Sequence, residues 1–71
     1  MKRYSVVYER TPRNWSAYVT DLPGCVATGR TREDVERHIR EAIEFHLDGM
    51  QTEGLPIPEP TTETGAVEVG R

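Results

Sequence analysis

The 71-residue sequence has few of the residues that small domains use for covalent or metal cross-links. It contains one cysteine, Cys25, so no disulfide can form within one chain. Its two histidines, His38 and His46, lie too far apart for a metal-binding pair on adjacent helical turns. We therefore expect no metal and no cofactor. A core this small is marginal, so we expect self-association as a dimer or tetramer.

Long apolar runs are also missing. No segment approaches the ~20 apolar residues needed to cross a bilayer. No opening segment resembles a signal peptide. A single unpaired cysteine suits a reducing compartment. These features predict a cytoplasmic protein without membrane contact.

The charges are unevenly distributed. Residues 1–30 carry five basic and two acidic side chains, whereas residues 31–71 carry four basic and ten acidic ones, and the formal net charge is −3. The overall basic excess of a nucleic-acid-binding domain is absent. An acidic second half suits a basic partner. The alternative is that these charges only keep the protein in solution.

Three segments in the first half alternate between apolar and polar residues, which predicts β-strands. They are residues 2–9, residues 15–20 and the shorter segment 25–28. The polar residues 10–14 and the turn formers of residues 21–24 separate them. The spacing predicts an antiparallel three-stranded meander.

One helix is predicted after the strands. Thr31 and Asp34 form a variant capping box at its start, and Gly54 supplies the left-handed residue after its end near Thr52. Apolar positions recur at helical spacing on one face. They are Val35, Ile39, Ala42, Ile43, His46 and Met50.

The C-terminal residues predict an extended segment and a final strand. Residues 55–65 contain alternating prolines followed by a polar loop, and residues 66–69 alternate like a short strand. We expect this fourth strand to lie beside the first and parallel to it, after a right-handed crossover. The predicted order is β-β-β-α-β, an α+β fold in a single domain, 1–71, with a core of about residues 2–54.

Four motifs in this order resemble the HicB family. They are the D-L-P-G-C turn of Asp21–Cys25, the helix start Gly29–Thr31, the E-A-I-E-F-H-L helix of Glu41–Leu47 and the proline-rich exit Gly54–Pro60. The resemblance extends from residue 4 to about residue 60.

The resemblance implies an antitoxin that neutralises HicA, a small basic RNA-cleaving toxin, and a truncated RNase H-like fold. Many HicB-family proteins carry a further C-terminal DNA-binding domain. The sequence stops at Arg71 without such a segment. We therefore expect no direct DNA binding from this chain alone.

An RNase H-like shape raises the alternative of a metal-dependent nuclease. That chemistry needs carboxylates that converge on two metal ions ~4 Å apart. The middle of the first predicted strand has no carboxylate, Glu9 lies at its end, and Asp21 lies in a turn. Cys25 has no recognisable base partner, so we interpret it as a small buried apolar residue. We predict a non-enzymatic protein-binding module; a solitary homo-oligomer with another partner or ligand is the other alternative.

The second half of the helix carries the predicted partner-binding residues. Glu41, Glu44 and Asp48 follow Arg40 with no further basic residue until Arg71. Acidic groups near a helix C-terminus oppose the helix dipole, and such a violation of a local rule can mark a functional surface.

Four apolar residues complete the predicted surfaces. Phe45 and Leu47 lie at opposite margins of the helix's apolar face, so we add them to the partner-binding set. Val7 and Tyr18 lie on the far face of the sheet, where we predict an oligomer interface.

Overall fold

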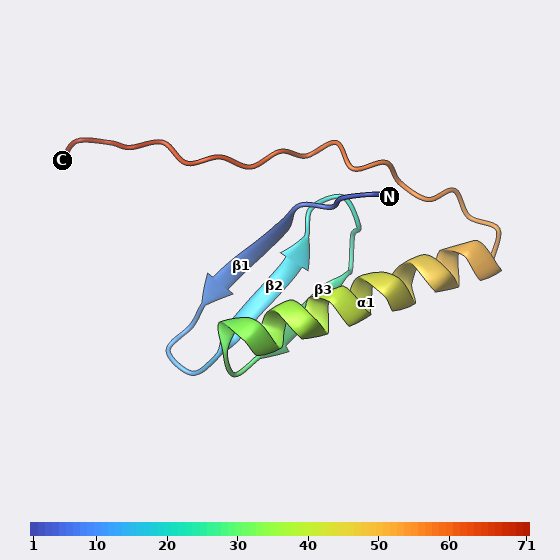
Figure 1. The fold of residues 1–71 in the computed structure, drawn as a ribbon, viewed down its shortest axis with the longest axis horizontal. Coiled ribbons are helices and arrows are strands. Elements are labelled where there is room, and N and C mark those ends of the chain that lie inside the picture. Colours follow the sequence, from blue (N-terminus) through green and yellow to red (C-terminus); the bar gives the residue numbers. More distant parts are fainter.

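The computed structural model describes residues 1–71 as three strands followed by one helix (Figure 1). The elements are β1 (Val6–Arg10), β2 (Trp15–Val19), β3 (Val26–Gly29) and α1 (Arg32–Thr52). The strands form one antiparallel sheet in the order β1-β2-β3. The predicted α+β class, the meander and the single helix are confirmed.

The core lies between the sheet and α1. The inward residues of β2 and the D-L-P-G-C turn are buried, and Leu22 of that turn is fully enclosed. The six buried residues are Ala17, Val19, Leu22, Cys25, Val35 and Ile39. The interpretation of Cys25 as a buried apolar residue is therefore confirmed. Burial also raises the pKa of its thiol, which keeps the sulfur protonated.

Both predicted ends of the helix are confirmed. The Thr31 hydroxyl accepts a hydrogen bond of 3.0 Å from the Asp34 amide. At the other end Gly54 has φ of 72°, its amide donates to the Gln51 carbonyl, and the next amide donates to Met50. This pair of bonds is the Schellman motif, which satisfies carbonyls that the helix itself leaves free.

α1 packs on β2 and β3 and leaves the inner face of β1 largely uncovered. Val35 and Ile39 are the helix residues in the core. The helix approaches Gly29 so closely that an added Cβ there would lie 2.5 Å from the Val35 nitrogen and 2.9 Å from its Cα. Only glycine permits this contact between the end of β3 and the first turn of the helix.

The predicted fourth strand is wrong. Residues 66–69 form no strand, and the chain after α1 runs back past the N-terminus and beyond the sheet (Figure 1). It runs beside residues 2–5, but side chains rather than a backbone ladder hold it there. Prolines 56, 58 and 60 have no N–H to donate, so one edge of this stretch has no ladder donors at these three positions.

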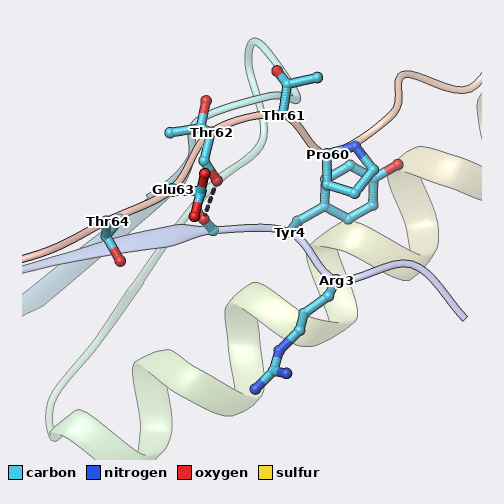
Figure 2. Close-up of a pocket in the computed structure, with 8 residues that line it drawn as sticks. Arg3, Tyr4, Pro60, Thr61, Thr62, Glu63 and Thr64 are labelled. Carbon is cyan, nitrogen blue, oxygen red and sulfur yellow. Dashed lines mark hydrogen bonds between the residues drawn. The ribbon is translucent and has the colours of Figure 1, made fainter.

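A clasp at Asp21 fixes the path of the tail. The Asp21 carboxylate accepts hydrogen bonds from the amides of Thr61 and Thr62, at 3.0 Å each, and from both hydroxyls, at 3.3 and 2.9 Å. The Ser5 hydroxyl donates to the Thr62 carbonyl at 2.7 Å, the dashed line in Figure 2. These bonds engage the amides of residues 61 and 62, just before the segment that was predicted as the fourth strand.

Two more contacts hold the tail against the N-terminus. The Tyr4 hydroxyl donates to the Pro58 carbonyl at 2.6 Å, and Lys2 forms an ion pair with Glu59. Figure 2 shows Tyr4 beneath the tail at Pro60, with Arg3 pointing toward the helix instead.

We expect Gly29→Ala to destabilise the fold, because its methyl group would collide with the helix backbone. Overpacking of this kind costs ~1–3 kcal/mol. A thermal melt should show a lower Tm. Gly65→Ala is the matched control, since nothing lies within 4 Å of a Cβ at that position. Equal Tm values for the two variants would contradict the proposed contact.

The clasp should open in acid. The Thr62 amide and then its hydroxyl hold the pKa of Asp21 below its ordinary value of 3.8, despite a smaller opposing effect of burial. Because the pKa is lowered in the folded state, the ionised Asp21 carboxylate stabilises the clasped tail fully above pH 3.8. This stabilisation is lost as the pH falls through the lowered pKa and the carboxylate is protonated.

Hydrogen exchange of the Thr61 and Thr62 amides measures this release. Both amides should lose protection in that pH range, and in Asp21→Ala at neutral pH. The control Glu63→Ala, one residue further along the tail, should leave them protected. Protection that survives in Asp21→Ala would show that the clasp does not hold the tail.

Candidate functional site

The second half of α1 presents an acidic face with an aromatic residue inside it. Glu41, Glu44, Phe45 and Asp48 are all exposed, and the Phe45 side chain is 82% exposed. Spacings of three and four residues place Phe45 beside Glu41 and Asp48 on the helix surface. None of the three carboxylates has an ion-pair partner, and the last turn contains no basic residue. The structure thus brings four of the five predicted partner-binding residues together.

Leu47 lies apart from this acidic face. It is half-buried and packs against the core. It also lines a groove between the helix and the N-terminal segment, together with Tyr4, Ile43 and Ile57. The sequence pattern places Leu47 at the margin of the helix's apolar face, and the structure adds Ile57 of the tail to the same groove.

The far face of the sheet carries an apolar row across all three strands. Val7 pairs with Tyr18, which pairs in turn with Val26. Tyr18 is 43% exposed and Val26 63%. The structure therefore brings Val7 and Tyr18 together and adds Val26, which was not among the predicted interface residues. The alternation of residues 25–28 already indicated that Val26 lies on this face. Successive residues of a strand point to opposite faces, and its neighbour Cys25 points into the core.

The carboxylates of the nuclease alternative are not brought together. Asp21 is engaged by the two threonines of the tail, and Glu9 lies on β1 near the hairpin loop. No group of three or more His, Cys, Asp or Glu side chains is placed to hold a metal ion. The one helix is not apolar enough to cross a membrane.

These features define a small α+β protein whose distinctive sites are exposed surfaces. The comparison with known families agrees with that class. The profile described as "HicB_like antitoxin of bacterial toxin-antitoxin system" matches residues 4–68, so the chain belongs to the HicB-like antitoxin family, whose proteins are typically non-enzymatic.

Two curated relatives support this membership. A UPF0150 protein of Helicobacter pylori is 35% identical over 51 residues, which cover 72% of this chain and 71% of that protein. An uncharacterized 14.9 kDa protein in the rep-hol intergenic region of Haemophilus phage HP1 is 30% identical over 56 residues, 79% of this chain. The match covers 42% of the phage protein, so the chain spans less than half of that relative. No solved structure matches the chain significantly.

Proposed function

We propose that the protein is the antitoxin of a HicA–HicB type II toxin-antitoxin system. It acts in the cytoplasm, without catalysis, and neutralises a small basic RNA-cleaving toxin by direct binding. The observation that carries this proposal is the acidic face of α1, formed by Glu41, Glu44 and Asp48 around the exposed Phe45. Family membership supplies the class of partner.

The electrostatics of this face favour a basic partner. Three carboxylates without ion pairs lie in the second half of the helix, and Asp48 lies next to the last turn, where the free backbone carbonyls supply partial negative charge. The fields add, which attracts a cationic protein during diffusional encounter. Phe45 provides an apolar contact inside the charged area, and aromatic residues surrounded by polar ones are typical centres of protein interfaces.

Reversal of the acidic face should weaken toxin binding. The variant Glu41→Lys, Glu44→Lys, Asp48→Lys should raise the Kd for a basic toxin encoded beside this gene by about 100-fold, and binding should lose most of its salt dependence. Isothermal titration at several salt concentrations measures both effects. The control Glu53→Lys, Glu63→Lys, Glu68→Lys changes the net charge equally outside the face. Similar losses in the two variants would show only a dependence on net charge.

Phe45→Ala tests the apolar contact separately. Loss of an interface anchor costs ~2 kcal/mol or more, so the Kd should rise about 30-fold or more. The Tm should stay unchanged because the ring is 82% exposed in the free protein. Leu55→Ala is the control, because Leu55 is another exposed apolar residue and lies outside the helix. A fall in Tm without a change in Kd would place Phe45 in folding instead of binding.

A second candidate function is a homo-oligomer that binds another partner or ligand. The apolar row of Val7, Tyr18 and Val26 favours it, because these side chains form a continuous strip on the far sheet face. The strip is separate from the acidic face of α1, so a dimer or tetramer formed through it leaves that face free.

The third alternative is the metal-dependent nuclease. The placement of Asp21 and Glu9 gives it no support, because Asp21 already accepts four hydrogen bonds from the tail. Metal-dependent RNA cleavage that disappears in Asp21→Ala would overturn this order of the candidates.

A further inference from the structure

The displacement of α1 toward β3 leaves an apolar groove of about 570 Å³ between β1 and the helix. Its apolar floor comes from both elements. The residues are Tyr4, Val6, Tyr8, Ile39 and Ile43. All but Ile39 are only partly buried. At one end Arg32 stacks on the Tyr8 ring, 3.5 Å from its centroid.

The backbone beside this groove is also unpaired. β1 pairs only with β2. The Thr20 amide donates to the Ser5 carbonyl at 3.2 Å, and hydrogen-bonded pairs alternate along an antiparallel ladder. The next such pair is Val7 with Tyr18, so the N–H and C=O groups of Val6 and Tyr8 point to the free edge. A strand added there would place its side chains directly over the groove.

The same chain contains an unpaired segment with strand character. Ala66, Val67, Glu68 and Val69 alternate, and Val67 and Val69 are 87% and 68% exposed. They lie on the part of the tail that extends beyond the sheet, which helps make the molecule 49 Å long (Figure 1). Two exposed valines on one face of an extended segment suit an apolar groove.

The register prevents these valines from reaching the groove of their own chain. The Ser5–Thr62 bond places residue 62 beside residue 5. If the tail continued from there as a strand parallel to β1, both strands would rise by ~3.3 Å per residue. Val67 would then lie beside Arg10, and Val69 would lie beyond the end of β1. Glu63, Thr64 and Gly65 would lie against the groove instead. While the Asp21 clasp is closed, Val67 and Val69 must come from another molecule.

We propose that residues 66–69 of a second copy of this chain add a strand to the free edge of β1. Val67 and Val69 of that copy insert into the groove between β1 and α1. The exchange is reciprocal in a two-fold dimer, so each copy gives its tail and receives the other's. Because both copies use the same two surfaces, the assembly is complete as a dimer and does not grow into a larger polymer.

Charge complementarity supports this occupant. Three basic side chains (Lys2, Arg3 and Arg40) and two acidic ones (Glu36 and Glu44) line the groove, which gives it a small positive excess. Lys2 pairs with Glu59 and Arg40 lies 3.9 Å from Glu36, so Arg3 is the basic side chain that remains without an ion pair. The tail carries Glu63 and Glu68 and has no basic residue before Arg71. The dimer also covers the exposed edge strand, which otherwise invites unspecific pairing.

Sedimentation equilibrium of the full chain tests the proposal. The wild-type protein should be a dimer, and Val67→Asp with Val69→Asp should weaken dimerisation at least tenfold. The control Ala66→Asp with Gly70→Asp adds the same charge to the opposite face of the segment and should leave the dimer intact. A monomeric wild-type protein, or equal behaviour of the two variants, would overturn the proposal. Circular dichroism should show no unfolding, because these valines are exposed.

Disulfide trapping distinguishes exchange from pairing within one chain. A Val6→Cys chain mixed and oxidised with a Val67→Cys or Val69→Cys chain should form a covalent dimer of the two different chains. A link found only when both cysteines are in one chain would contradict exchange. If Tyr18→Asp dissociates the dimer and the tail variants do not, the far sheet face is the interface and the exchange proposal fails. Toxin binding on α1 is measured separately, so the antitoxin proposal stands or falls on its own test.

Discussion

The close contact between Gly29 and the first turn of α1 determines how the rest of the molecule is arranged. Because residue 29 has no side chain, the helix backbone lies directly against the end of β3. Val35 and Ile39 then enter the core above β2 and β3. A single helix centred there cannot also cover β1. The asymmetry of the two-layer fold is therefore a direct consequence of one missing side chain.

This asymmetry separates the surfaces that remain available for binding. The inner side of β1 is left as a groove, the far side of the sheet is a flat apolar strip, and the outer side of α1 is acidic. The first two surfaces are apolar and the third is charged, so they suit different kinds of contact. A domain with so small a core gains from covering the first two surfaces, because apolar burial in a dimer adds to the stability of each folded chain.

Most of the fold could be predicted because its signals are local. The strands follow from alternation, and the helix ends follow from Thr31, Asp34 and Gly54, each of which acts on amides or carbonyls within a few residues. The fourth strand was wrong because its outcome depends on a distant residue. Asp21, forty residues earlier, binds the amides of Thr61 and Thr62, and this position of the tail carries residues 66–69 toward and past the end of β1. Alternation alone contains no information about such a contact.

The candidate site was predictable to a similar degree. The acidic face followed from charge order along one helix, where position and spacing are enough. Leu47 packs against the core, and Ile57 of the tail lines the same groove, which no local sequence pattern reports.

The clasp also explains where the prolines stop. They occupy positions 56, 58 and 60, and the next position in this alternation is Thr62. A proline at residue 61 or 62 would remove an amide that Asp21 binds, whereas another residue would lose only a hydroxyl. Related sequences that keep the aspartate should therefore tolerate many residues at these two positions but exclude proline. The D-L-P-G-C turn thus constrains the chemistry of a segment forty residues away.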